Sequence, residues 1–271
     1  MKLAVMSDIH CNFSVFTILV NDALRNGVTH FLFLGDLITD GYRGNDIIRL
    51  IKKLNGITVL GNREEYINNY QTMNEEYNLR INHKSLGYNS LSKETLEYIK
   101  ILEEKRLINI NGKKILMMHK IEDYDKLINA NDFEICLYGH THIPKVFKYK
   151  NKLFINPGSV GMTYNNYFNY MILEFSDKVL CNITNKKLKL TSKLLTEIKN
   201  DLKKTNYLEE NYEWSKLLIS EIAYSRNLIS GFMKKLNKEI IEKNITSEEY
   251  NKIFKEKLCI FLKENNIVIN L

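Results

Sequence analysis

Short apolar runs of strand length alternate with amphipathic helical patterns through the first two-thirds of the chain. This alternation is typical of an α/β layer architecture. The first helix is expected to begin after the N-cap residue Asn12 and to end at Gly27. Its expected buried face consists of Phe13, Phe16, Val20, Ala23 and Leu24. The order at the N-terminus is therefore strand, helix, strand, helix, strand. The predicted strands are residues 3–6, 31–34, 57–60, 115–118, 135–138, 154–155, 170–175 and 179–183.

From Leu190 onwards the pattern is purely helical. Apolar stripes at helical spacing predict two to four amphipathic helices, the last of which has capping-box spacing at Thr246 and Glu249. Such stripes are too apolar to face water, so we expect them to pack on the α/β body or at a homodimer interface. The expected division is an α/β domain over residues 1–185 and an amphipathic helical extension over residues 186–271.

A polar segment rich in Asn and Tyr runs from Glu64 to Ser90 without a clean period. We expect a helix here with a loop over one edge of the sheet. Its position makes it a candidate for substrate-specific contacts.

Residues that bind metal ions well follow five of the predicted strands. The carboxyl ends of strands in an α/β sheet line one crevice, so these side chains are expected to converge. An Asp-x-His pair or a lone His is weak evidence for a metal site. Seven such residues at five strand ends are hard to explain by packing alone. They are Asp8 and His10, then Asp36, Asn62 and His119, and finally His140 and His142.

In chain order these motifs read D-x-H, G-D, G-N, H and G-H-x-H, and over about residues 1–185 the chain resembles the calcineurin-like metallophosphoesterase superfamily. The N-P-G-S-V-G run at residues 156–161 is similar to the small bacterial and archaeal phosphodiesterase branch, which also includes the retromer scaffold subunit. The resemblance implies a four-layer α/β/β/α sandwich of two mixed sheets with helices outside. The C-terminal helical extension would be an addition to that fold.

The resemblance also implies two metal ions bridged by Asp36. One ion would be held by Asp8, His10, Asp36 and His142, and the other by Asp36, Asn62, His119 and His140. Imidazole and carboxylate ligands suit divalent transition metal ions, and we expect manganese, with Fe, Zn, Ni or Co as alternatives. A hydroxide that bridges the ions would attack the phosphate ester, and their charge would stabilise the phosphoryl oxygens.

The chain departs from the usual family motif at residues 61–64, which read G-N-R-E where most members have G-N-H-D or G-N-H-E. The family His serves as a general acid, whereas the Arg63 guanidinium stays protonated and cannot donate a proton. It can hold a phosphate oxygen, so Arg63 and Asn62 are the candidate substrate-binding residues. In the alternative interpretation, Arg63 pairs with Glu64 or Glu65 at a helix start.

We expect Asp36, Asn62, Arg63 and His119 to form the catalytic set. Lys120 follows His119 where relatives usually carry Gly. It is either a second phosphate contact or a solvated charge.

Composition narrows the class of protein. A chain of 271 residues with 44% apolar, 11% aromatic and 26% charged residues can bury one or two cores and is not a disordered chain. The four Cys are far apart, which excludes a disulfide framework or a zinc ribbon and favours a reducing cytoplasm. The N-terminus leaves no room for a signal peptide, and no apolar run is long enough to span a membrane.

The net charge of +7 resides mostly in the extension, where residues 186–271 contribute +5. Because Lys, Asn and Ile are frequent throughout, this excess is interpreted as general composition, and nucleic acid is not a favoured partner.

The leading hypothesis is therefore a dimetal phosphoesterase that acts on a phosphate-ester substrate. Diesters are favoured over monoesters because loss of the acid His penalises poor leaving groups. The alternatives are an interaction scaffold of the same fold and a nuclease. Retention of all seven ligand positions favours an enzyme over a scaffold, and the missing G-N-H motif argues against the nuclease.

Overall fold

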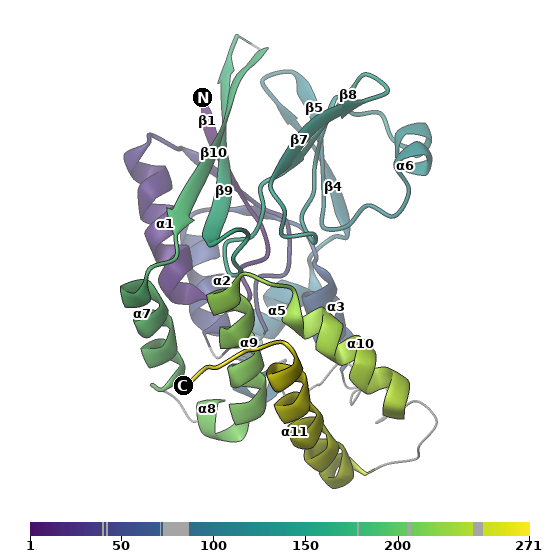
Figure 1. The fold of residues 1–271 in the computed structure, drawn as a ribbon. Coiled ribbons are helices and arrows are strands. Elements are labelled where there is room, and N and C mark those ends of the chain that lie inside the picture. Colours follow the sequence, from purple (N-terminus) through teal and green to yellow (C-terminus); the bar gives the residue numbers. More distant parts are fainter. Residues whose placement is uncertain are drawn as a thin grey trace.

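Two five-stranded mixed sheets face each other in the computed structural model, and helices cover the outer face of each sheet (Figure 1). The structure describes residues 1–39, 41, 43–70, 72, 87–177, 179–204, 207–240 and 246–271. The expected four-layer α/β/β/α sandwich is thereby confirmed.

The first sheet has the strand order β10-β9-β1-β2-β3. Its central strands β1, β2 and β3 are parallel, and β9 and β10 are antiparallel additions on one side. The three parallel strands therefore end at the same edge. The strands are β1 (Lys2–Met6), β2 (His30–Phe33), β3 (Ile57–Thr58), β9 (Tyr167–Ser176) and β10 (Val179–Lys189).

The second sheet has the order β4-β5-β6-β8-β7. Strands β5, β6 and β8 are parallel, and the antiparallel strands β4 and β7 form the two edges. The strands are β4 (Lys105–Ile110), β5 (Lys113–Met118), β6 (Ile135–Leu137), β7 (Lys145–Tyr149) and β8 (Lys152–Asn156).

Successive side chains of a strand point to opposite faces of the sheet, and in the central strands both faces are buried. In β1, Leu3 and Val5 join the apolar cluster between the sheets, whereas Ala4 and Met6 face the cluster under the outer helices. A third, smaller cluster lies under α6 on the outer face of the second sheet. In the body the helices are α1 (Phe13–Arg25), α2 (Gly44–Lys53), α3 (Asn62–Asn69), the 3-10 turn η2 (Tyr88–Ser90), α5 (Lys93–Lys100) and α6 (Tyr124–Ala130).

The C-terminal part is helical from Ser192 and packs against the body. Its apolar residues belong to the same buried cluster as those of α1, so the stripes are covered within one chain. The side chain of Ser14 donates to Asp201, and Arg43 forms an ion pair with the same carboxylate at 3.2 Å. The helices are α7 (Ser192–Leu202), α8 (Tyr207–Glu210), α9 (Tyr212–Tyr224), α10 (Leu228–Ile240) and α11 (Ser247–Glu264).

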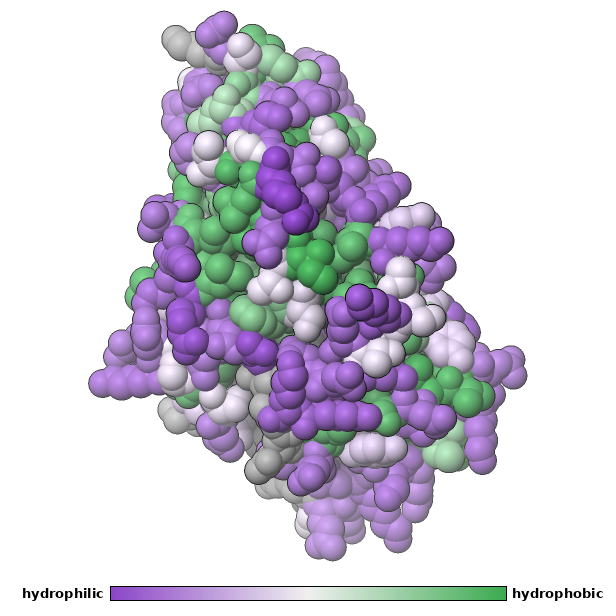
Figure 2. Space-filling model, turned by 90° about the vertical axis from the view of Figure 1, so that its left-hand side faces the viewer, coloured by the Kyte–Doolittle hydropathy of each residue, from purple (hydrophilic) through white to green (hydrophobic). Residues whose placement is uncertain are grey.

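The surface agrees with this inward orientation of the apolar stripes. Figure 2 shows that the lower half of the molecule, which the helices form, is mostly hydrophilic in that view. Within the part of the chain that the structure describes, no helix has both the length and the apolar character needed to cross a bilayer.

Some local predictions differ from the structure. Leu24 is 48% exposed, so its inclusion in the buried face of the first helix was wrong. The strand predicted at residues 57–60 is shorter in the structure, where β3 comprises only Ile57–Thr58, because the chain then turns toward α3. Strand β10 continues past residue 185 to Lys189. The edge strands β4 and β7 were missed because most of their side chains are exposed and carry no apolar pattern.

Because the C-terminal helices (the tail, α7–α11) share one apolar cluster with the α/β body, we expect both to unfold together. Leu217→Ala removes a fully buried side chain of α9 and should lower the free energy of unfolding by about 2–5 kcal/mol. Trp214, the single Trp of the chain, lies in α9, so its fluorescence reports on the tail, while circular dichroism reports on the whole chain. Coincident transitions are expected, and an earlier fluorescence transition would contradict the shared core.

Candidate metal centre

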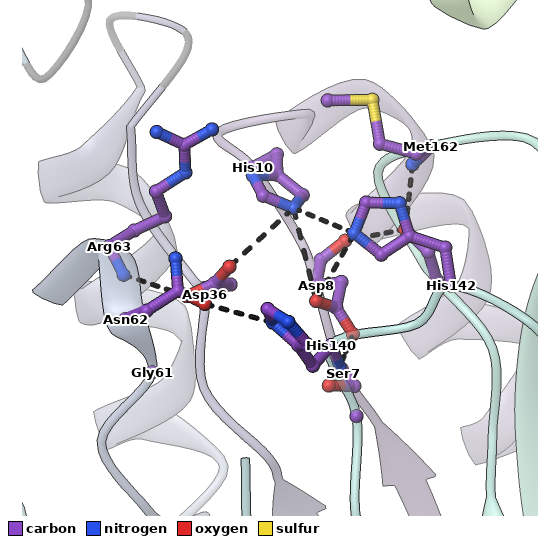
Figure 3. Close-up of polar contacts among 12 residues, drawn as sticks. Ser7, Asp8, His10, Asp36, Gly61, Asn62, Arg63, His140, His142 and Met162 are labelled. Carbon is purple, nitrogen blue, oxygen red and sulfur yellow. Dashed lines mark hydrogen bonds and ion pairs between the residues drawn. The ribbon is translucent and has the colours of Figure 1, made fainter. Parts of the chain in front are cut away.

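The seven predicted ligands lie at the facing carboxyl ends of the parallel strands in the two sheets. Asp8 and His10 follow β1, and the other positions follow β2, β3, β5 and β6 in the same way. Figure 3 shows that side chains from both sheets point toward a common centre. The later members are Asp36 after β2, Asn62 at the start of α3, His119 after β5, and His140 and His142 after β6.

Two groups of potential ligands have donor atoms within 4.8 Å of one another. One consists of Asp8, His10 and His142, and the other of Asp8, Asp36 and His119. The Asp36 Oδ2 atom lies 3.9 Å from His10 Nε2 and 3.4 Å from His119 Nε2. Asp36 is therefore placed between the two sets of imidazoles.

Asn62 connects the imidazoles on the other side of the centre. Its Oδ1 atom lies 3.0 Å from His119 Nε2 and 3.0 Å from His140 Nδ1. His119 Nδ1 lies 2.7 Å from the Leu34 carbonyl oxygen, which can only accept a hydrogen bond. Nδ1 of His119 therefore carries a proton, and its Nε2 atom is directed to the centre.

The backbone around the centre is held in an unusual conformation. Asp8, His10, Asp36, His140 and His142 all have positive φ values, between 46° and 68°. This left-handed region is uncommon for residues other than Gly, and such strain persists only where the surroundings enforce it.

Two glycines allow the strand ends to come close together. A Cβ atom on Gly35 would lie 2.6 Å from the Gly61 backbone, and one on Gly139 would lie 2.0 Å from Ser7 Oγ. Gly35 also has a φ of +85°. Side chains at these positions would push apart the loops that carry the ligands.

The two carboxylates of the centre are fully desolvated but remain charged. Burial alone would raise the pKa of Asp36, but the charges of His119, His10 and Arg63 outweigh burial and lower it. Burial likewise opposes ionisation of Asp8, and His142 lowers its pKa below the usual value. The same attraction to Asp36 overcomes burial at His119 and raises its pKa to about 10. Negative charge at this depth therefore depends on neighbouring positive charge.

The donor set fits a metal ion. The Asp8 Oδ1 atom is buried and makes no hydrogen bond of good geometry, although His142 Nε2 lies 3.3 Å from it, and Asp8 Oδ2 accepts the His140 backbone N–H at 3.0 Å. A buried carboxylate oxygen without a well-formed hydrogen bond is costly, and a cation would satisfy it. His10 Nε2 and His142 Nε2 lie 3.3 Å apart, as two ring nitrogens would when they ligate one ion.

Glu64 is a structural member of the site, whereas its sequence position indicates only a possible partner of Arg63. Its fully buried carboxylate accepts hydrogen bonds from four backbone N–H groups at 2.8–3.1 Å. Burial and the nearby Asp36 charge raise its pKa to about 7, in opposition to these hydrogen bonds. Glu64 is the third residue of α3 and accepts the N–H of the N-cap residue Gly61, which is the Glu half of a capping box, and a Glu at this spacing after Gly61 is the sequence signal that could have identified it. The donors belong to Asp36, Leu37, Ile38 and Gly61.

Arg63 stands next to the centre. Its backbone N–H donates to Asp36 Oδ1 at 2.9 Å, and its guanidinium extends beside His10 (Figure 3). The Glu64 carboxylate faces the Asp36 loop, so it is not the group that orients the guanidinium. The Lys120 Nζ atom lies 3.0 Å from Glu122 Oε1, and the Lys120 side chain is half-exposed.

Two cavities border the centre. A cavity of about 550 Å³ is lined by His10, Asp36, Arg63 and His142 on one side and by residues of α9 and α10 on the other. A second cavity of about 660 Å³ lies between His119 and α6. Asn62 lines both, so the centre is accessible from two directions.

Solved structures share this fold. A metallophosphoesterase from Sphaerobacter thermophilus has a TM-score of 0.62 and 20% identity, covering 82% of this chain and 99% of its own. A hypothetical protein from Pyrococcus horikoshii has a TM-score of 0.61 and 16% identity, over 80% of this chain and 97% of its own. A third structure, described as a novel archaeal phosphodiesterase, has a TM-score of 0.50 and 20% identity, over 69% of this chain and 100% of its own.

Sequence comparison identifies the family. An uncharacterized protein of Methanocaldococcus jannaschii is 28% identical over 199 residues, which cover 59% of this chain and 76% of that protein. A sequence model described as the calcineurin-like phosphoesterase superfamily domain matches residues 1–178, well over half of the chain. All the strand-end motifs of the centre fall within the matched residues. The chain therefore belongs to the calcineurin-like phosphoesterase superfamily.

Proposed function

We propose that this protein hydrolyses phosphate esters with two divalent metal ions and prefers phosphodiesters. The observation that carries the proposal is the pair of buried carboxylates, Asp8 and Asp36, surrounded by imidazole and amide groups from both sheets. All seven expected ligand positions have ligating side chains, which favours an enzyme over an interaction scaffold.

The residues suggest how two ions would be shared. One ion would be held by Asp8, His10, Asp36 and His142, and the other by Asp36, Asn62, His119 and His140. The position of Asp36 Oδ2 between His10 and His119 supports its assignment as the shared ligand. When bound, divalent transition metal ions such as Mn²⁺ supply an activated water and positive charge toward the phosphoryl oxygens.

The chain itself holds these groups in place. Glu64 fixes the loop of Asp36 through backbone hydrogen bonds, and the Leu34 carbonyl fixes the ring of His119. Arg63 would bind a phosphate oxygen, and its guanidinium does not release a proton to a leaving group because the pKa of a guanidinium is too high. Substrates whose leaving group needs no protonation are therefore favoured.

The two cavities support a preference for diesters. A phosphodiester has two organic groups, and the centre is bordered by one cavity toward α9 and α10 and another toward α6. Each is within the range of volumes that bind small-molecule groups, roughly 300–1,000 Å³. The archaeal phosphodiesterase with the same fold is consistent with this assignment.

Asp36→Asn tests the shared ligand. Both ions lose a charged ligand, so Mn²⁺ occupancy should fall and hydrolysis of bis(4-nitrophenyl) phosphate should drop by about a hundredfold or more, since metal-activated water is lost. Metal analysis and steady-state kinetics measure the two effects. Asp132→Asn, an exposed position, is the control and should leave both unchanged. Full activity in Asp36→Asn or in the presence of a chelator would refute the dimetal proposal.

Glu64→Gln tests the positioning of Asp36. The amide places an N–H₂ group against backbone donors, which should lower the free energy of unfolding by about 1–3 kcal/mol. The displaced Asp36 loop should also weaken Mn²⁺ binding and lower kcat. Chemical denaturation, calorimetric Mn²⁺ titration and kinetics are compared with Glu97→Gln, an exposed control. A destabilised variant with normal Mn²⁺ affinity and kcat would reduce Glu64 to a purely structural role.

Arg63 variants test whether this residue binds substrate. Arg63→Ala should raise KM for diesters and lower the rate only modestly for good leaving groups. Arg63→His should restore a general acid and increase turnover of esters with poor leaving groups, a contribution of about 10²–10⁴-fold in other enzymes. Kinetics on esters of graded leaving-group pKa, with the exposed Arg49→Ala as control, measure both effects. Equal slopes and unchanged KM in all variants would remove Arg63 from the mechanism.

A further inference from the structure

Hydrogen bonds hold the corner between α9 and α10, residues 225–227, near the metal centre. Thr163 Oγ1 donates to the Ile222 carbonyl at 2.7 Å, and the Asn166 backbone N–H donates to Ser225 Oγ at 2.9 Å. Arg226 donates to the carbonyl and the side-chain oxygen of Asn265, beyond α11. These bonds join the corner to the β-sandwich on one side and to the end of the chain on the other.

The first two turns of α10 form a wall of the cavity that opens onto the centre. Ser230 and Met233 line it opposite His10 and His142, in a volume of about 550 Å³. These α10 residues lie outside the part of the chain that matches the family model, which ends at residue 178. The wall is thus a feature of the C-terminal extension that reaches the family's catalytic region.

The chemistry of this wall is neutral and mixed. Asn227 and Ser230 offer amide and hydroxyl groups, whereas Ile229 and Met233 offer apolar surface. The nearby Glu221 carboxylate accepts the backbone N–H groups of Leu228 and Ile229 at 3.0 and 2.7 Å, so it is engaged in holding the start of α10.

The second cavity has a different character. Lys105, Lys120 and Lys126 line the cavity toward α6, together with several carboxylates. Among the described residues that line the α10 cavity, Arg63 is the one Lys or Arg side chain. The α10 cavity is therefore unsuited to a second anionic group and suited to an uncharged one with polar edges and apolar faces.

We propose that the wall formed by Asn227, Ser230 and Met233 is a specificity subsite that binds the uncharged organic group of the phosphodiester, with a nucleoside as the fitting chemical class. The proposal rests on the proposed function and deepens it. A nucleoside has hydrogen-bonding edges for Asn227 and Ser230 and a flat apolar face for Met233. Its phosphate would lie toward Arg63 and the metal ligands.

Two esters with the same leaving group isolate this subsite. Thymidine 5′-(4-nitrophenyl) phosphate and methyl 4-nitrophenyl phosphate release the same phenolate and differ only in the retained group. The native protein with Mn²⁺ should show a higher kcat/KM for the thymidine ester. Met233→Ala and Ser230→Leu should each reduce that preference by about tenfold, as changes in a specificity pocket do, with little effect on the methyl ester. Lys234→Ala, exposed on the same helix, is the control and should keep the preference.

Binding provides a readout that does not depend on turnover. Calorimetric affinities for thymidine 5′-monophosphate and for inorganic phosphate are compared in the same Mn²⁺-loaded variants. Loss of thymidine monophosphate affinity with unchanged phosphate affinity supports the subsite, even if neither ester is hydrolysed and the proposed function fails. The subsite is overturned if the native protein hydrolyses both esters without a preference, or if the variants affect both esters equally. Either result leaves the phosphoesterase proposal standing. Equal affinity changes for both ligands overturn the subsite as well.

Discussion

The geometry of the centre depends on one buried carboxylate. The Glu64 carboxylate accepts hydrogen bonds from backbone N–H groups that follow β2 and from the N–H of Gly61 after β3. It thereby links the ends of two strands. Parallel strands have no direct turn between them, so their ends are otherwise held only by the sheet. Gly35 and Gly61 permit the close approach that this carboxylate enforces. Asp36 and Asn62 are consequently presented on rigid backbone, although both follow the ends of short strands.

Hydrogen bonds of the same kind, from backbone N–H groups to buried carboxylates, explain how the site tolerates strain and charge. Five of the ligand residues have left-handed backbone conformations, and two carboxylates lie out of water. Neither feature is stable by itself. Hydrogen bonds from loop backbone to buried carboxylates offset both, as at Asp36 Oδ1 with the Arg63 N–H and at Asp8 Oδ2 with the His140 N–H. The loops that carry the proposed metal ligands are therefore held in place by hydrogen bonds within the chain itself.

The sequence predicts those parts of this structure that follow from burial. The central strands and α1 are recognised because their apolar periodicity reflects contact with a core, and the strand-end ligands follow from the position of polar residues after those strands. Strands β4 and β7 are held by backbone pairing to β5 and β8, which leaves no side-chain pattern. From the sequence, Glu64 is only a possible charge partner of Arg63, because its actual donors are backbone groups that become neighbours only in the fold. The wall provided by α10 depends on tertiary packing, which periodicity does not reveal.

The C-terminal helices connect the stability of the chain with the shape of its site. Their apolar residues continue the cluster that supports α1 and the outer face of the first sheet, so the body is not covered without them. The α9–α10 corner is also bonded to residues 163 and 166, a few positions after the N-P-G-S-V-G run that packs on the Asp8 loop. These bonds hold the start of α10, and sites on a fixed helix are more precise than sites on loops. In the proposed subsite, variation in α10 would therefore alter which ester is preferred without moving Asp36 or His119, because these two residues are held by Glu64 and by the Leu34 carbonyl.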